Sequence, residues 1–484
     1  KKSKSKNARG ALTAKEKRAE QRRDARSSKK EVARRGDDRR STRGMSKRER
    51  QAESRRLAAE RRREAIEAAR RAEAARQAAI ARQRAIDQGL RDETAANILK
   101  DETTGEDLEI RRIAVAALGN AAGSVVVMDP KTGRVYTVVN QDWALRKGYK
   151  PCSTIKLVTG LAGLCENVID PLAPVGGRGV DLTTSLAYSD NPYFQSVGGR
   201  VGFDRIMTYA RDLGLGERTG VNYANESPGR VPLFKTGYAV NHMCSHGDDF
   251  EVTPIQLGAL VSAIANGGDL LMPHVPRSPE ETIRFKREVR RRINIPEETL
   301  KRMVPGMIGA VNYGTAKLAY DPVQTVAGKT GTCIGQGGWL GLFTSYAPVS
   351  DPKLAVVVVM RGSGARGKAA AAIAGKIYRA LNGRFGTPTN MQYANTPEAL
   401  APRPNSKAAI VSDESEADEA ARAGVDPTDE SGAQEMERPA VKSVLMPVPS
   451  RTNEPKAGAA TPSATPMPGA QEAQRPRRVA TPRP

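Results

Sequence analysis

The sequence predicts an α+β domain in which an antiparallel sheet packs between helices, with a tail on each side of the domain. Residues 125–128 and 135–139 are strand-like runs, and the Asp-Pro-Lys-Thr-Gly sequence between them is typical of a turn. Three further strand-like runs lie close together later in the chain, at residues 325–332, 339–346 and 353–360. Because short turns join consecutive strands, we expect antiparallel pairing rather than parallel crossovers.

Apolar residues recur at helical spacing between and after these strands. They predict helices over residues 157–164, 253–266, 299–311 and 369–381. Gly267 and Gly268 follow the second of these, as glycine commonly does after a helix. The β-branched run at residues 356–359 favours a central strand.

Most of the positive charge lies in the first hundred residues. They hold 33 Lys and Arg residues against 15 Asp and Glu residues, whereas the whole chain has a formal net charge of +23. Residues 1–50 contain few apolar side chains and predict a disordered basic tail. Residues 51–100 are rich in Ala, Arg and Glu, with pairs such as Glu67 and Arg71, and predict a helix that ends near Gly89. Its thin apolar stripe indicates a solvated single helix, with a coiled coil as the alternative.

The predicted folded domain spans residues 105–386. Residues 387–484 are rich in Pro, Ala, Ser and Glu and predict a second disordered tail. A Pro- and Gly-rich segment at residues 171–179 interrupts the domain. The chain starts at Lys1 rather than Met, which indicates a processed, trimmed or partial chain.

The basic N-terminal tail could be attracted to an anionic membrane surface, a cell-wall polymer or nucleic acid. No aromatic residue precedes Tyr136, which argues against base stacking by this tail, and no folded DNA-reading motif is visible. Specific nucleic-acid binding is therefore not predicted. A solvated tail with only weak, nonspecific attraction is the simplest alternative.

Chemistry is first indicated by Ser153 and Lys156, which precede the helix predicted at residues 157–164. Side chains three apart on a helix share one face, so the lysine amine can approach the serine hydroxyl and accept its proton. A serine at a helix start also lies near the positive end of the helix dipole. Alone, the pair is better explained by an N-capping serine followed by an exposed lysine, because serine and lysine three apart recur by chance in most proteins.

Two further motifs follow in order, Ser189-Asp190-Asn191 and Lys329-Thr330-Gly331-Thr332. The ordered set S-x-x-K, S-D-N and K-T-G is the signature of penicillin-binding proteins and class A β-lactamases. Residues 112–384 resemble the transpeptidase domain of a penicillin-binding protein, and residues 124–140, 204–232, 252–268 and 326–332 extend the resemblance. Ordinary turns would also explain Ser189 and Asn191 if they stood alone.

The resemblance implies a role for each motif residue. Ser153 is the expected nucleophile, Lys156 its base, Ser189 a proton relay, Asn191 a holder of the substrate amide, and Lys329 a neighbouring charge that steers a substrate carboxylate. Thr330, Gly331 and Thr332 are expected to bind the substrate, and the backbone N–H groups of Ser153 and Thr332 to form the oxyanion hole. Asp190 receives no role.

The resemblance also implies a function, a D,D-transpeptidase that cross-links peptidoglycan stem peptides and is covalently inhibited by β-lactams. A D,D-carboxypeptidase or a β-lactamase of the same serine chemistry is an alternative, as is a non-catalytic envelope scaffold or β-lactam sensor. Glu226 lies in the region where a class A β-lactamase has its deacylating glutamate, but its surroundings resemble the transpeptidase pattern. No glycosyltransferase domain fits before residue 112, which argues against a bifunctional synthase.

Other residue clusters suggest no cofactor. His242, Cys244 and His246 alternate along the chain, which is a poor pattern for a tetrahedral metal site, so we predict neither a metal nor another cofactor. Cys152 and Cys333 flank the first and third motifs, where a redox-sensitive pair is conceivable if the two residues meet.

Localisation rests on the resemblance, which implies the cell envelope at the outer face of the cytoplasmic membrane or the periplasm. No apolar run approaches the roughly 20 residues of a membrane-spanning helix, and no signal peptide is visible. We expect either that an anchor was removed before Lys1 or that another chain holds this one.

Overall fold

The computed structural model describes residues 46–170 and 181–386, all of which belong to one compact unit. Three regions lie outside the described residues: most of the basic tail, the Pro- and Gly-rich segment at 171–179, and the whole C-terminal tail. Among the described residues, no helix combines the length and apolar character that a membrane span requires.

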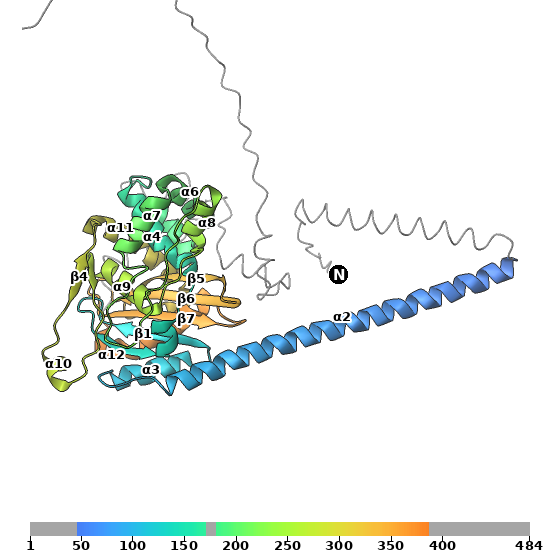
Figure 1. Cartoon of the computed structure of the whole chain (residues 1–484), viewed down its shortest axis with the longest axis horizontal. Coiled ribbons are helices and arrows are strands. Elements are labelled where there is room, and N and C mark those ends of the chain that lie inside the picture. The colour runs from blue at the N-terminus through green and yellow to red at the C-terminus, as the bar shows by residue number, and fades with distance from the viewer. Residues whose placement is uncertain (1–45, 171–180, 387–484) are drawn as a thin grey trace, which may run out of the picture. The chain divides into compact units, whose positions relative to one another are not determined.

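A five-stranded sheet forms the centre of the domain (Figure 1). Its strands in chain order are β1 (Gly123–Met128), β2 (Val135–Val139), β5 (Ala327–Gly335), β6 (Gly338–Ala347) and β7 (Leu354–Arg361). They lie in the order β2-β1-β7-β6-β5, and every neighbouring pair is antiparallel. The predicted antiparallel sheet and the central position of the β-branched strand β7 are confirmed.

Helices cover both faces of this sheet (Figure 1). Along β7, Val357 and Val359 join the apolar cluster beneath α9 (Pro254–Ala265), whereas Val356 and Val358 join the cluster beneath α3 (Leu108–Leu118) and α12 (Gly367–Phe385). Alternate side chains of a strand point to opposite faces, so a strand covered on both sides is apolar throughout. The predicted α+β arrangement, a sheet between helices, is therefore confirmed.

The face that carries α9 supports a layer of further helices. These are α4 (Lys156–Cys165), α5 (Leu182–Tyr188), α6 (Asn191–Val201), α7 (Phe203–Asp212), α8 (Tyr238–His246) and α11 (Glu297–Asn312). Shorter elements complete the described domain: a π-helical turn η1 (Asp142–Arg146), 3₁₀ turns η2 (Cys152–Ile155) and η3 (Lys317–Ala319), α10 (Pro279–Ile283), and a small hairpin of β3 (Asp269–Leu271) and β4 (Val289–Arg292).

Helix α2 (Lys47–Ile98) precedes the domain and runs straight through Gly89, where the sequence predicted its end. A glycine inside a helix costs about 1 kcal/mol relative to alanine, which local contacts can offset. Here Glu93 accepts hydrogen bonds from the Trp143 indole (2.9 Å) and from Lys147 (2.7 Å), and Leu90 packs against the core. Tertiary contacts therefore extend the helix beyond the glycine.

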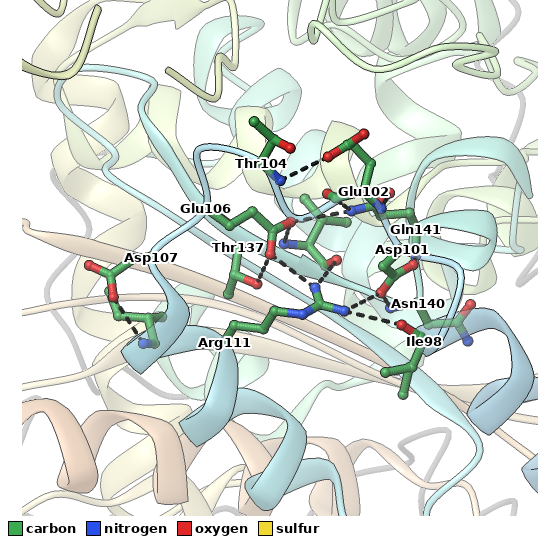
Figure 2. Close-up of polar contacts among 12 residues, drawn as sticks. Ile98, Asp101, Glu102, Thr104, Glu106, Asp107, Arg111, Thr137, Asn140 and Gln141 are labelled. Atoms are coloured by element: carbon green, nitrogen blue, oxygen red, sulfur yellow. Dashed lines mark hydrogen bonds and ion pairs between the residues drawn. The ribbon is translucent and has the colours of Figure 1, made fainter. Parts of the chain in front are cut away.

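A buried polar network joins the segment after α2 to strand β2 (Figure 2). Arg111 on α3 donates to Asp101 (2.7 Å) and to Glu106 (2.9 Å). Glu106 also accepts from the Thr137 hydroxyl at 2.7 Å, and Asp101 from the Asn140 backbone at 2.8 Å. Burial raises the pKa of Asp101, although Arg111 opposes this effect. One cation thus holds two buried carboxylates and fixes the linker against the sheet.

Candidate active site

The Ser153–Lys156 motif lies where the 3₁₀ turn η2 runs directly into helix α4. The Lys156 amine lies 2.5 Å from the Ser153 hydroxyl, and both side chains are buried. The turn and the helix start bring the two groups onto one face, as the three-residue spacing predicts. Sequence reasoning therefore located this pair correctly.

The Ser189-Asp190-Asn191 motif forms the junction between α5 and α6. Ser189 ends α5 with a left-handed backbone (φ 60°), and Asp190 caps α6 by accepting a hydrogen bond from the Tyr193 N–H at 2.8 Å. Burial raises the pKa of the Asp190 carboxyl. The sequence predicted no role for Asp190, which thus caps α6. The residues on either side of it, Ser189 and Asn191, both contact Lys156.

Ser189 lies between two lysines that come from distant parts of the chain. Its hydroxyl is 3.0 Å from the Lys156 amine, 2.8 Å from the Lys329 amine and 2.8 Å from the Ser153 hydroxyl. Lys329 is fully buried on strand β5 and also donates to the Thr330 carbonyl at 2.9 Å. The three motifs therefore converge on one hydrogen-bonded cluster.

Asn191 completes the contacts of Lys156. Its side-chain oxygen accepts a hydrogen bond from the Lys156 amine, and its nitrogen lies 3.2 Å from Nε2 of His246. The Ser189 backbone carbonyl is a further acceptor, 2.9 Å from the same amine. All these groups are buried, so they form hydrogen bonds with one another rather than with bulk water.

Strand β5, which carries the third motif, is an edge strand of the sheet. The Thr330 hydroxyl is hydrogen-bonded to Thr315 at 2.6 Å, and the Thr332 hydroxyl accepts from the Gly367 N–H at 2.7 Å. The partner of Thr330 lies in the segment between α11 and η3, and that of Thr332 at the start of α12. Both threonine side chains are on the face of β5 opposite Lys329. An edge strand can still offer its backbone to an extended peptide.

Gly331 lies where β5 packs closely against the segment that precedes Ser153. A Cβ atom at this position would lie 3.0 Å from the Pro151 carbonyl oxygen and 3.2 Å from the Cβ of Cys152. Any side chain would push the strand away from the turn, which explains the need for glycine in this motif. Cys152 and Cys333 form a disulfide in the same contact region, with their Cα atoms 5.6 Å apart.

Other residues singled out in the sequence have structural partners. Glu226 accepts hydrogen bonds from the Thr219 N–H (2.7 Å) and the Gly220 N–H (3.0 Å), so its carboxylate stabilises the loop in which it lies. Burial raises the pKa of the Cys244 thiol to about 12. Within residues 46–170 and 181–386, no cluster of three His, Cys, Asp or Glu side chains is placed to hold a metal ion.

Sequence reasoning missed two neighbours of the site, His246 and Thr315. The sequence considered His246 only as a metal ligand and drew nothing from Thr315. Both contacts join segments that are distinct in the fold, α8 with α6 and the turn after α11 with β5, so no local pattern could reveal them.

Comparison with known proteins agrees with this geometry. Residues 123–173 and 172–379, together more than half of the chain, match the profile of the family described as the penicillin binding protein transpeptidase domain. The chain belongs to this family. The resemblance seen in the motifs is thereby confirmed.

Curated relatives include enzymes of cell-wall synthesis. Stage V sporulation protein D of Bacillus subtilis is 28% identical over 312 residues, which cover 52% of this chain and 48% of that protein. The peptidoglycan D,D-transpeptidase MrdA of Acinetobacter baumannii is 24% identical over 366 residues, covering 58% of this chain and 54% of the relative. The chain spans about half the length of the curated relatives it matches.

Solved structures show the same fold. The transpeptidase domain of Burkholderia pseudomallei penicillin-binding protein 3 aligns with a TM-score of 0.50 at 20% identity, covering 58% of this chain and 96% of that one. Pseudomonas aeruginosa PBP2, solved in complex with WCK 5153, aligns with a TM-score of 0.51 at 22% identity, covering 60% of this chain and 81% of the other.

Proposed function

We propose that this chain is an active-site-serine D,D-transpeptidase that cross-links peptidoglycan stem peptides, with residues 105–386 as its catalytic unit. The observation that carries the proposal is the contact of 2.5 Å between the Lys156 amine and the Ser153 hydroxyl, with Ser189 and Lys329 joined to it. Family membership and the peptidoglycan D,D-transpeptidases among its relatives support the same reaction.

A neutral Lys156 amine, which can act as a base, is compatible with the hydrogen bonds around it. The Ser189 carbonyl and the Asn191 side-chain oxygen can only accept, so they use both N–H groups of a neutral amine. Its lone pair is then left to accept the proton of Ser153. Burial of Lys156 and the nearby charge of Lys329 also favour the neutral form.

The proposed reaction begins when Ser153 attacks the carbonyl carbon of the acyl donor and its proton moves to Lys156. An ester to Ser153 forms, the amide bond to the leaving D-amino acid breaks, and Ser189 passes a proton to the leaving amine. The amine of a second stem peptide then attacks the ester and forms a new amide bond, while its proton passes through Lys156 to the departing Ser153 oxygen and restores the hydroxyl. We propose the backbone N–H groups of Ser153 and Thr332 as the oxyanion hole.

The remaining third-motif roles are also proposals. Lys329 would attract the donor carboxylate, and the backbone of Thr330, Gly331 and Thr332 would pair with an extended substrate along the edge of β5. Asn191 would hold the substrate amide. Because this chemistry concerns peptidoglycan, we place the protein at the cell envelope, with β-lactams as acylating inhibitors.

The test is the intact-protein mass after incubation with benzylpenicillin, for the wild type and for Ser153→Ala. We expect a stable one-to-one adduct in the wild type and none in the variant. Rapid drug turnover would indicate a β-lactamase, and the bracing contacts of Glu226 argue against that outcome. Absence of any adduct would refute the catalytic proposal and leave the non-catalytic envelope scaffold.

We further propose that the basic tail attracts an anionic membrane surface or cell-wall polymer without taking part in acylation. A chain that starts at residue 83 keeps the contacts of Asp87 and Glu93 with the domain. It should react with benzylpenicillin at the wild-type rate while binding anionic vesicles less. A slower reaction would show that the tail contributes to catalysis.

A further inference from the structure

His246, the last residue of α8, lies against the second motif although 55 residues separate it from Asn191. Its ring is buried, with Nε2 3.2 Å from the side-chain nitrogen of Asn191. Gly198 lets α8 approach α6 this closely, because a Cβ atom at that position would lie 2.2 Å from the Cβ of Cys244. The packing of two helices thus sets a histidine beside the active-site cluster.

The hydrogen bonds around the ring determine which nitrogen carries the proton. The Ser245 hydroxyl donates to the His242 carbonyl at 3.0 Å and therefore accepts from Nδ1 of His246, which is 2.6 Å away. The same carbonyl, which can only accept, lies 3.3 Å from Nδ1. Nδ1 is thus the protonated nitrogen, and in a neutral ring Nε2 is an acceptor.

An acceptor at Nε2 orients the amide of Asn191. The amide nitrogen donates to His246, so its oxygen points the other way, toward the Lys156 amine. With the amide reversed, the nitrogen would face the N–H groups of Lys156 and the oxygen would face a lone pair of His246. Both pairs would then be mismatched in a buried site, where unmet hydrogen bonds are costly.

We propose that His246 is a positioning residue for Lys156, acting through Asn191. By holding the amide oxygen on Lys156, His246 engages one amine N–H and leaves the amine lone pair directed at Ser153. The inference rests on the proposed serine acylation. It adds that the histidine contributes as a hydrogen-bond acceptor, and that its effect falls on the acylation step rather than on binding of the acyl donor.

The test compares His246→Leu with His246→Gln, using benzylpenicillin and quenched-flow measurement of acylation at increasing drug concentration. Glutamine can offer an oxygen near the position of Nε2, whereas leucine offers no acceptor. We expect the leucine variant to lose about tenfold in the maximal acylation rate, the scale of one hydrogen bond, with little change in the half-saturating concentration. The glutamine variant should stay within about threefold of wild type.

His274→Leu is the matched control, because His274 instead lies near Glu281 and Phe285. It should acylate at the wild-type rate. Thermal melting checks that each variant is folded, and His246→Met, also of similar size, replaces the leucine variant if that one does not fold.

Two outcomes would overturn the positioning role: a wild-type rate in the leucine variant, or an equal loss with leucine and glutamine. Neither would affect the proposed function, since the Ser153-dependent adduct would still form. If the wild type itself forms no adduct, the proposed function and this inference both fail.

Discussion

Ser189 and Cys152 show how single residues beside Ser153 hold uncommon backbone conformations. Ser189 has φ 60° and Cys152 has φ 49°, both in the left-handed region that a non-glycine residue enters at a cost of about 1–2 kcal/mol. At Ser189 this conformation ends α5 abruptly and turns both the carbonyl and the hydroxyl toward Lys156. Strain of this kind concentrates at functional sites, where the surrounding packing maintains it.

Asp248 is a second residue whose environment controls its chemistry. It forms an ion pair with Lys150 (2.6 Å) and a hydrogen bond with His242, whose ring stacks on that of His246. Burial acts to raise the pKa of Asp248, but the His242 and Lys150 contacts outweigh it and hold the pKa well below its usual value. The folded state therefore stabilises the ionised form of Asp248 more than the unfolded state does.

We predict that Asp248→Asn lowers the free energy of unfolding by about 1–3 kcal/mol at pH 5, as expected for a hydrogen bond to a charged group. Because the folded pKa is depressed, this contribution is present above the unfolded pKa near 4 and declines as the pH falls below it. The difference between the two proteins should shrink by about 1 kcal/mol by pH 3. Urea denaturation at both pH values measures it, and an unchanged difference would contradict the assignment.

At the scale of elements, the disulfide joins the turn η2 to strand β5, across a sequence separation of 181 residues. Gly331, two residues before Cys333, also packs closely against Cys152. Ser153 follows Cys152 directly and Lys329 lies on the same strand as Cys333, so the link helps to set the distance between the first and third motifs. The two cysteines flagged in the sequence therefore do meet.

We predict that the double variant Cys152→Ser/Cys333→Ser loses about 2–5 kcal/mol of stability, because the disulfide restricts the unfolded chain. We also expect it to react more slowly with benzylpenicillin, since η2 can move relative to β5. Calorimetry and acylation kinetics measure the two effects. Cys165→Ser, which removes a free half-buried thiol, is the control and should change both much less.

At the scale of the whole described unit, Arg111 connects the linker after α2 with the central sheet (Figure 2). Its side chain is 11% exposed, while those of Asp101 and Glu106 are 1% and 0% exposed. Arg111 is the cation that these two deeply buried carboxylates share, and backbone N–H groups and the hydroxyls of Thr137 and Tyr223 supply further donors. Removing a single partner from such a cluster leaves uncompensated buried charge.

We predict that Arg111→Met destabilises the protein by about 3–5 kcal/mol. The neighbouring Arg112 is exposed, so Arg112→Met serves as the control and should change stability by less than about 0.5 kcal/mol. Urea denaturation of both variants measures the difference. Equal stabilities would mean that the network contributes little to holding the linker.

Some features were predictable because their signals are local. The hairpin of β1 and β2, the central strand β7 and the capped helix α9 follow from residue periodicity, β-branching and turn sequences within short windows. The end of α2 was not predictable from Gly89, because Trp143 and Lys147, some fifty positions along the chain, hold Glu93 in place. Local propensity is a weak preference that tertiary contacts override.

By itself, the sequence determined the order and spacing of the three motifs, and thereby the family and the α+β class. Only the tertiary structure decided which groups meet: Ser189 with Lys329 across 140 positions, Cys152 with Cys333 across 181, and His246 with Asn191 across 55. The physical reason is that periodicity reports the conformation of neighbouring residues. Contacts between distant side chains depend instead on how helices and strands pack, for which no short stretch of sequence carries the information.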